Sequence, residues 1–148
     1  MIFPSIIEYK SGAYDEMVAL RHKILRAPLG LTFSEEDLER DAKDILLVLS
    51  APRPPRIVAC CILSLVDERR VKLRQMAVDD TIQNSGLGTS MLAVAEFVAQ
   101  KEGFEVITLH ARKLAVGFYE KYGYKIIGEE FQEVGIPHNE MEKIIERP

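Results

Sequence analysis

The sequence predicts an α+β fold, with one curved, mostly antiparallel mixed sheet of about seven strands and helices on both faces. Apolar and β-branched runs typical of buried strands alternate along the chain with stretches of helical periodicity. A length of 148 residues suits one domain with a substantial core. Because no repeat, low-complexity segment or long linker interrupts the chain, residues 1–148 are predicted to form a single domain.

The N-terminal half begins with a predicted strand at residues 3–9. Helical spacing follows over residues 14–25, and a Pro-Leu-Gly stop signal ends it. A segment that resembles a capping box, residues 34–37, starts a short helix. Residues 45–51 and 57–66 are near-continuous apolar runs, and the proline-rich segment between them predicts a hairpin of two buried strands.

The C-terminal half continues the sheet with a predicted strand at residues 70–78. The main helix spans residues 86–101, and a further strand spans residues 106–111. A second, shorter helix then ends at a glycine suited to a left-handed conformation. Residues 125–133 and 138–145 are the last two predicted strands, and a Gly-Ile-Pro turn joins them.

Composition and charge exclude several classes of function. A net charge of −4, from 19 basic and 23 acidic residues, argues against nucleic acid as the main partner, because backbone phosphates require a basic surface. No apolar run reaches the roughly 18 residues of a membrane helix, and no signal peptide begins the chain. Cys60 and Cys61 are expected on opposite faces of one strand, so neither a disulfide nor a zinc site is predicted. We expect a cytoplasmic protein without a metal. Its oligomeric state stays open, with a homodimer as one alternative.

A glycine turn at residues 83–89 is the most informative motif. It reads Gln83-Asn-Ser-Gly86-Leu-Gly88 and leads into the main helix, whose first N–H groups have no carbonyl partners. The helix dipole adds positive charge there, so the turn predicts an anion site, most often for phosphate. The third small residue of a dinucleotide fingerprint is absent, and so is the lysine of a nucleotide-triphosphate loop. On its own the motif also fits a plain strand-to-helix connection.

A second motif follows the next strand and reads Ala115-x-x-x-Tyr119-x-x-x-Gly123-Tyr. Together, residues 71–92 and 106–124 resemble two motifs of the GNAT superfamily of N-acetyltransferases. These are the acetyl-CoA motif Gln/Arg-x-x-Gly-x-Gly/Ala and the later motif Ala-x-x-x-Tyr-x-x-x-Gly-Phe/Tyr. The two motifs cover roughly the C-terminal half of the chain, and the spacing between them is also similar to that of the family.

The C-terminal residues resemble one subgroup of this family. Residues 128–141 are similar to the ending of the small ElaA-type bacterial acetyltransferases, and residues 21–30 fit related branches. Two positions depart from the family pattern. Arg112 stands where many members of the subgroup have Gln, and Ala111 stands where the superfamily commonly has Asn. The polar contacts at the start of the second helix are therefore expected to differ.

The resemblance implies acetyl-CoA as cosubstrate and an unidentified primary amine, of a small molecule or a peptide, as acceptor. In the family, two central strands splay apart, and the pantetheine arm pairs with the free backbone of one of them. One N–H of that segment also polarises the thioester carbonyl. Carried over residue by residue, the cofactor-binding positions are Met76, Ala77, Val78, Gln83, Ser85, Gly86, Leu87, Gly88 and Thr89.

Tyr119 aligns with the family's general acid, which protonates the departing CoA thiolate. A phenol has a pKa of about 10 and a thiol of about 8.5, so this proton transfer is uphill unless the site assists it. An aromatic stripe on a core helix is the alternative for Phe118 and Tyr119. We assign Phe118 to the core and Tyr119 to catalysis. Tyr122 is the second candidate for the acid, with a core role as its alternative.

Several residues are candidates for the base that deprotonates the amine. His138 is assigned to the rim of the acceptor pocket, as a binding or proton-relay residue, because the ordinary pKa of histidine lies near neutral. His110 ends a central strand, and Glu140 shares a strand face with His138. His22, on the first helix, is a further candidate, and each has a structural or surface role as its alternative. The acidic run at residues 35–37 either caps a helix or attracts a cationic acceptor.

The resemblance leaves three functions in competition. The leading one is an acetyl-CoA-dependent N-acetyltransferase whose acceptor attacks the thioester directly. A catalytically silent CoA-binding sensor or interaction module is the alternative, and the presence of Tyr119 argues against it. A structural protein without a CoA site is the third, and it would not bind acetyl-CoA at all.

Overall fold

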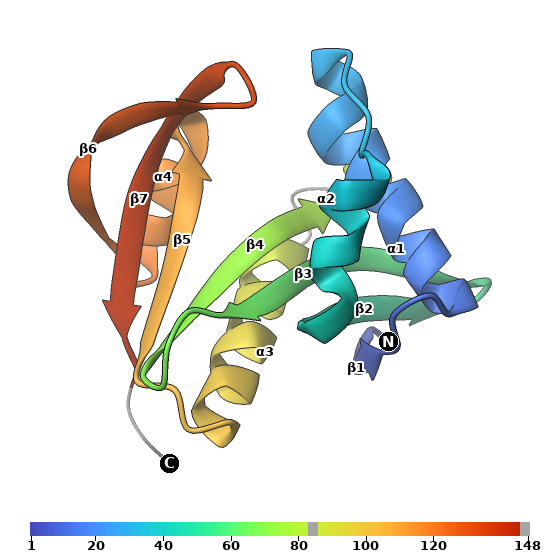
Figure 1. The fold of residues 1–148 in the computed structure, drawn as a ribbon. Coiled ribbons are helices and arrows are strands. Elements are labelled where there is room, and N and C mark those ends of the chain that lie inside the picture. Colours follow the sequence, from blue (N-terminus) through green and yellow to red (C-terminus); the bar gives the residue numbers. More distant parts are fainter. Residues whose placement is uncertain (83–85, 146–148) are drawn as a thin grey trace.

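The computed structural model describes residues 1–82 and 86–145. They form one seven-stranded sheet in the order β1-β2-β3-β4-β5-β7-β6 (Figure 1). All neighbouring strands pair antiparallel except β4 and β5, which pair parallel. The predicted mixed, mostly antiparallel sheet of seven strands is therefore confirmed. The strands are β1 (Phe3–Ile7), β2 (Ile45–Pro52), β3 (Pro55–Leu65), β4 (Arg70–Val78), β5 (Val106–Arg112), β6 (Lys125–Glu133) and β7 (Ile136–Ile144).

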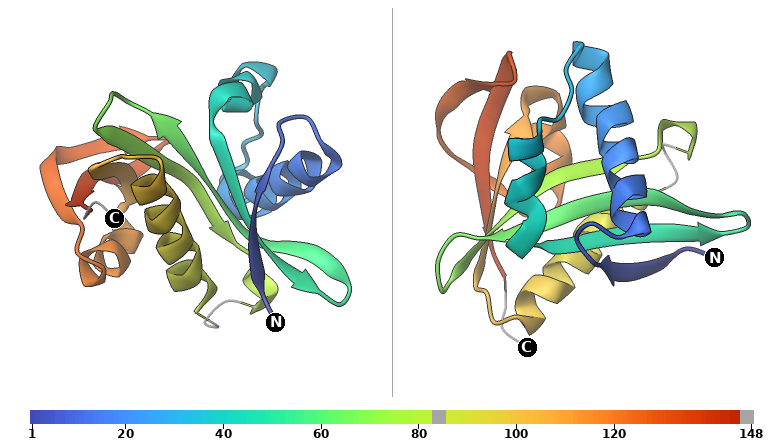
Figure 2. Two further views of the ribbon diagram at one scale, coloured as in Figure 1. Left: turned by 90° about the horizontal axis from the view of Figure 1, so that it is seen from below. Right: turned by 45° about the vertical axis from the view of Figure 1, so that its right-hand side comes forward.

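Helices cover both faces of the sheet, as predicted (Figures 1 and 2). One face carries α1 (Gly12–Arg21) and α2 (Glu35–Glu39), and the other carries α3 (Leu87–Lys101) and α4 (Val116–Lys121). Short 3-10 turns precede or follow several of these helices. The predicted capping box is present at the start of α2, where the side chain and backbone of Ser34 both bond to the residue three positions on.

Each face of the sheet has its own hydrophobic core, because successive strand residues point to opposite sides. Cys61 belongs to the core beneath α3 and α4, which also contains Met91. Cys60 belongs to the core beneath α1, which also contains Met17. Both thiols are buried, and neither forms a disulfide.

The end of the first helix differs from the prediction. The chain is α-helical only as far as Arg21, and His22–Arg26 then form a π-helical turn. A 3-10 turn, Ala27–Leu29, follows and ends at Gly30 with a left-handed φ of 70°. Apolar periodicity does not distinguish these tighter and wider turns from an α-helix. Turns of the π type concentrate at functional sites, and this one borders the cleft described below.

The last hairpin also differs from the prediction. Its turn is formed by Val134 and Gly135, with φ of 47° and 79°, so β7 begins at Ile136 and Pro137 lies inside the strand. Two successive residues with positive φ match the right-handed twist of a hairpin. Proline cannot take part in such a turn, since its ring fixes φ at about −65°.

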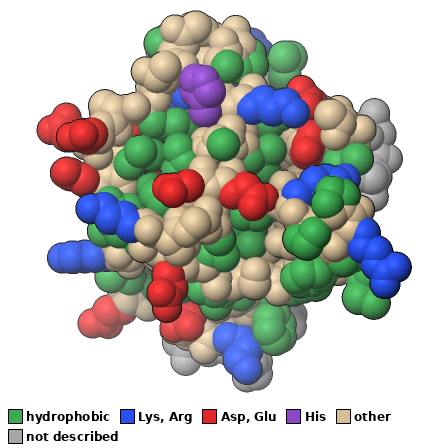
Figure 3. Space-filling view, turned by 90° about the vertical axis from the view of Figure 1, so that its right-hand side faces the viewer, with side chains coloured by type: hydrophobic (Ala, Val, Ile, Leu, Met, Phe, Trp, Pro, Cys, Tyr) green, Lys and Arg blue, Asp and Glu red, His purple; other side chains and the backbone are tan. Residues whose placement is uncertain are grey.

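The surface on the α1 side carries charges of both signs. Figure 3 shows acidic and basic side chains interspersed with apolar ones on this face. This mixture agrees with the small net charge of −4. Within the ranges that the structure describes, no helix is both long enough and apolar enough to span a membrane.

Candidate active site

The central strands β4 and β5 are paired along only part of their length. Their register runs from Arg70 opposite Val106 to Leu73 opposite Leu109, and beyond this point the strands diverge (Figure 1). The register of β4 against β3 shifts in the same region, where Gln75 has a left-handed φ of 56°. Such a bulge bends a strand and increases its twist. It therefore turns the end of β4 away from β5 and opens a cleft between them.

A cavity of about 690 Å³ lies on one side of this cleft, between the end of β4, the start of α3 and α4. Predicted cofactor-binding residues line it from two sides. They are Met76, Ala77 and Val78 on β4, and Gly86, Leu87, Gly88 and Thr89 at the start of α3. The remaining two candidates, Gln83 and Ser85, lie outside the described residues. The fold thus gathers the seven described candidates around one cavity.

The start of α3 borders the larger cavity and has no side-chain cap. Gly86 precedes the helix with a left-handed φ of 81° and offers no side-chain cap, so N–H groups of the first turn face the cavity without an intrahelical partner. A Cβ atom at Gly86 would meet no atom within 4 Å, so backbone conformation rather than crowding calls for glycine there. At Gly88, a Cβ atom would lie 3.5 Å from Cζ of Phe118. Phe118 therefore packs against the turn.

Tyr119 forms part of the wall between this cavity and a second one. It lines both cavities, as do Met76 and Ala115. Burial raises the pKa of Tyr119 well above the ordinary value of a phenol, so the hydroxyl stays protonated at neutral pH. Among the described residues this hydroxyl has no hydrogen-bond partner, whereas those of Tyr122 and Tyr124 bond to Thr89 and Glu96 of α3. As far as the described residues go, Tyr119 therefore presents an uncommitted proton donor at the junction.

The second cavity lies on the other side of the cleft, between the bulged part of β4, the end of β5 and the β6–β7 turn. It has a volume of about 150 Å³, and a wider hollow of about 440 Å³ shares much of its lining. His110 and Glu133 line both spaces, and His138 lines the smaller one. Two of the predicted base candidates are thus brought together, around a carboxylate.

The carboxylate of Glu133 lies between the two histidines. Its Oε1 atom is 3.0 Å from Nδ1 of His110, and its Oε2 atom is 3.6 Å from Nε2 of His138. Lys72 approaches Nδ1 of His110 to 3.4 Å. Burial opposes the charge of Glu133, but the hydrogen bond from His110 and the neighbouring positive charges outweigh it and lower its pKa. The group is therefore ionised at neutral pH and can attract a protonated amine.

His138 occupies the inner wall of the cavity rather than an exposed rim. Its side chain is 4% exposed and stacks on Phe131, with ring centroids 6.0 Å apart. Its Nδ1 atom lies 2.9 Å from the carbonyl oxygen of Ile136. Since a carbonyl oxygen only accepts, Nδ1 carries a proton in this contact, and the other ring nitrogen faces Glu133.

Other predicted candidates lie apart from this cluster. Glu140 pairs with His110 in the β5–β7 ladder, but its carboxylate accepts a hydrogen bond from Thr108 at 3.3 Å and does not line either space. His22 lies in the π-helical turn and is likewise outside the lining. Of the acidic run at residues 35–37, only Asp37 reaches the wider hollow, and it is bonded to Ser34 in the capping box. The capping interpretation of this run is therefore the one the structure supports.

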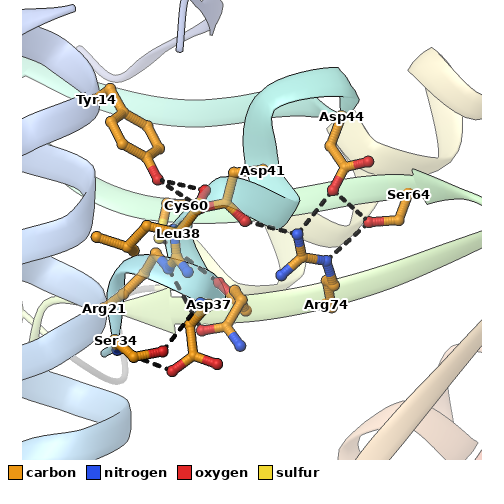
Figure 4. A network of polar contacts seen from close by, with 11 residues as sticks. Tyr14, Arg21, Ser34, Asp37, Leu38, Asp41, Asp44, Cys60, Ser64 and Arg74 are labelled. Atoms are coloured by element: carbon orange, nitrogen blue, oxygen red, sulfur yellow. Dashed lines mark hydrogen bonds and ion pairs between the residues drawn. The ribbon is translucent and has the colours of Figure 1, made fainter. Parts of the chain in front are cut away.

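A buried polar network holds β4 against the helices on its other side (Figure 4). Asp41 is fully buried and accepts hydrogen bonds from Tyr14, Arg21 and Arg74 at 2.6, 2.8 and 2.6 Å. Burial opposes the charge of Arg74, but its bonds to Asp44 and Asp41 outweigh that penalty and raise its pKa. Because Arg74 precedes the bulge, the network fixes the place where β4 leaves β5.

Sequence reasoning missed Glu133 and this network. A signal for Glu133 was available in the hairpin. With a two-residue turn at Val134 and Gly135, Phe131 pairs with His138, and Glu133 stands on the same strand face as Phe131. Recognition of that turn would have placed Glu133 beside His138. The partners in the network come from separate segments of the chain, so no local pattern points to them.

Comparison with known proteins identifies a family for this chain. A family model described as an acetyltransferase (GNAT) domain matches residues 33–145. YyaT, an uncharacterized protein of Bacillus subtilis, is 37% identical over 76 residues, which are 51% of each chain. The chain therefore spans about half the length of the curated relatives it matches.

Solved structures share the fold. Escherichia coli ElaA has a TM-score of 0.83 at 16% identity, over 97% of this chain and 99% of that one. A GNAT family acetyltransferase from Elizabethkingia anophelis, solved with acetyl-CoA bound, has a TM-score of 0.74 at 18% identity, over 97% and 98%. At these identities the likeness concerns the fold alone. Because the family model spans most of the chain, the protein belongs to the GNAT acetyltransferase family.

Proposed function

We propose that the protein transfers an acetyl group from acetyl-CoA to a primary amine of a small molecule or a peptide. The position of Tyr119 carries the proposal, because its side chain lines both cavities of the cleft. A thioester held in the larger cavity and an amine held in the smaller one would meet beside its hydroxyl. The acetyl-CoA complex of the Elizabethkingia relative supports the same cosubstrate here.

The larger cavity suits the shape and charge of CoA. The N-terminus of α3 offers backbone N–H groups to the pyrophosphate, and Lys121 adds a positive charge to the same lining. The β4 segment from Met76 to Val78 extends beyond its pairing with β5, so it can pair with the pantetheine arm as an added strand. The side chains of this segment pack in the interior while its backbone binds.

The reaction then needs three proton transfers. The amine gives a proton to the Glu133 cluster, directly or through water, and its lone pair attacks the thioester carbonyl carbon. A backbone N–H of β4 stabilises the negative oxygen that forms. As the C–N bond is made and the C–S bond breaks, Tyr119 donates its proton to the departing sulfur. The acylated nitrogen then loses its second proton, directly or through water, to the Tyr119 oxygen, which leaves the amide, free CoA thiol and a neutral phenol.

Burial affects both partners of the second proton transfer. It raises the pKa of Tyr119, which weakens the phenol as an acid. The thiolate is released into the same water-poor site, however, and burial raises the pKa of a thiol as well. The pKa values of the donor and of the acceptor therefore shift in the same direction.

One experiment separates the candidate functions. Calorimetry measures the binding of acetyl-CoA and CoA, and a thiol assay follows the release of free CoA with a broad panel of amines. An acetyltransferase binds both molecules with similar affinity and releases thiol with at least one amine. A silent CoA-binding module binds them and never releases thiol, and a structural protein binds neither.

A further inference from the structure

Two guanidinium groups converge on one carbonyl oxygen at the acceptor side of the cleft. Arg112 donates from Nη2 to the carbonyl oxygen of Leu25 at 2.8 Å, and Arg26 donates from Nη1 to the same oxygen at 3.2 Å. Arg112 ends β5, whereas Arg26 belongs to the π-helical turn. A single acceptor atom thus holds two positive charges from distant segments side by side.

Neither of these arginines has an acidic partner at ion-pair distance within the described part of the chain. The contrast with the neighbouring network is clear, since Arg21 and Arg74 are both paired with Asp41. Lys72 and Arg40 also line the wider hollow, and no described carboxylate forms an ion pair with them. The acceptor side therefore carries a surplus of positive charge.

The acidic groups on this side offset the surplus only in part, since the charges of Glu133 and Asp37 act on Arg26 and that of Glu133 acts on Arg112 without forming an ion pair. Glu133 is bonded to His110, and Asp37 is engaged in the capping box of α2. Arg26 and Arg112 are half-buried, and burial is the main cause that lowers the pKa of each, with the charge of Arg112 adding to the effect on Arg26. An anionic group between them would relieve the mutual repulsion and regain charge-assisted hydrogen bonds.

The location of the pair connects it with the acceptor rather than with CoA. Both arginines line the small cavity that also contains Tyr119 and Glu133. Neither lines the larger cavity, where Lys121 is the basic residue among the described lining residues. A molecule in the small cavity would therefore meet both the two cations and the Glu133 carboxylate.

We propose that the acceptor carries an anionic oxygen group, a carboxylate or a phosphate, which Arg26 and Arg112 bind while its amine faces Glu133. The inference rests on the proposed acetyltransferase function and names its substrate class. Amino acids and phosphate-bearing amines belong to this class, and polyamines and other purely cationic acceptors do not.

Matched pairs of amines test the inference. Thiol release is measured with an α-amino acid and its carboxamide, and with phosphoethanolamine and ethanolamine. One pair reports on a carboxylate and the other on a phosphate. Two charge-assisted contacts should favour the anionic member by about 10- to 100-fold in kcat/KM. Equal or higher kcat/KM for the neutral members of both pairs would overturn the inference.

Variants of the two arginines test whether they cause the preference for the anionic amine. Arg26→Gln and Arg112→Gln should each reduce the preference for the anionic member while leaving the KM for acetyl-CoA unchanged. Lys113→Gln is the matched control, because Lys113 is an exposed cation next to Arg112 and pairs with Glu130 outside the cavity. If Arg112→Gln fails to fold, Arg112→Lys retains the charge and should keep part of the preference. A preference that stays undiminished in every folded variant would remove the two arginines from the site.

A binding measurement separates failure of this inference from failure of the proposed function. The CoA-bound protein is titrated with an N-acetyl amino acid and with its amide, and NMR shifts report the affinity of each. Tighter binding of the anionic probe, without thiol release from any amine, would keep the anion site and reject the acetyltransferase. Equal binding of both probes, with thiol release from amines, would reject the anion site and keep the acetyltransferase.

Discussion

The hydroxyl oxygens of Thr89 and Tyr122 lie 2.8 Å apart and join the first turn of α3 to the end of α4. The start of α3 is the proposed phosphate site, and α4 carries Tyr119. This contact therefore helps to fix the proton donor relative to the phosphate site. It also engages the hydroxyl of Tyr122, which lies outside the linings of both cavities.

We expect Tyr122→Phe to lower the free energy of unfolding by about 1 kcal/mol, the usual contribution of one hydrogen bond. Turnover should change little, because this hydroxyl is bonded to Thr89 and does not face the thioester. Urea unfolding and steady-state kinetics measure the two effects. A large fall in kcat at unchanged stability would make Tyr122 the acid.

Gly86→Asp should abolish the binding of CoA. The variant places a negative charge beside the phosphates and also strains the left-handed backbone at this position. Gly86→Ala is the control, since it carries only the strain, at about 1–2 kcal/mol, and should keep most of the affinity. Calorimetry on the folded variants measures their affinity for CoA. Normal affinity in Gly86→Asp would contradict the phosphate-site assignment.

Tyr119→Phe should lower kcat by about 100- to 10,000-fold and leave the affinity for CoA unchanged, because the lost hydroxyl acts on the leaving thiolate. Tyr124→Phe is the matched control. That tyrosine is also buried, but its hydroxyl bonds to Glu96 at 2.9 Å, so stability and not kcat should fall. An unchanged rate in Tyr119→Phe would show that another group is the acid.

The raised pKa of Tyr119 adds a pH dependence to this prediction. Between the ordinary phenol pKa of about 10 and the higher value of the folded state, the folded protein holds a proton that the unfolded chain has lost. The free energy of unfolding should therefore fall as pH rises above about 10, and the fall should be smaller in Tyr119→Phe. Within this range the phenol of the folded protein should not ionise, as tyrosinate absorbance can show.

Glu133→Gln should lower kcat/KM for the amine, because the carboxylate that attracts and deprotonates it is lost. Glu130→Gln is the control, since Glu130 pairs with exposed Lys113 outside the cavities.

For His138→Ala, a raised KM for the acceptor or a missing limb in the pH–rate profile would support a role in the site. A lower melting temperature with unaltered kinetics would instead make His138 a structural residue.

Asp41→Ala should destabilise the protein by about 3–5 kcal/mol, because Arg21 and Arg74 would lose their shared buried partner. Arg69→Ala is the control. Its ion pair with Glu105 is largely exposed and should contribute about 1 kcal/mol or less. Similar losses in the two variants, measured by urea unfolding, would contradict the structural role of the network.

The fold was predictable because most of its elements have local signals. The capping box at Ser34, the glycine before α3 and the alternation at Cys60 and Cys61 each depend on residues a few positions apart. The predicted cofactor positions share this property, since they follow one another along a strand, a turn and a helix. The ends of the first helix and the last turn were misplaced, because similar apolar patterns fit several turn geometries.

The acceptor side was only partly predictable because its contacts join distant segments. Arg112 bonds to a carbonyl group 87 positions earlier in the chain. The approach of Glu133 to two histidines depends on the β5-β7-β6 order and on a turn shifted from its predicted place. Strand order and register follow from the packing of the whole sheet, and no short stretch of sequence encodes them.

The early divergence of β4 from β5 has a thermodynamic consequence. Their ladder ends at Leu73 and Leu109, so a pantetheine arm that pairs with β4 would take the place of a missing strand. A molecule that binds only the folded chain shifts the folding equilibrium toward that state. Under the proposed function, acetyl-CoA would thus complete the sheet of its own enzyme, and the melting temperature of the protein would rise with the concentration of its cosubstrate.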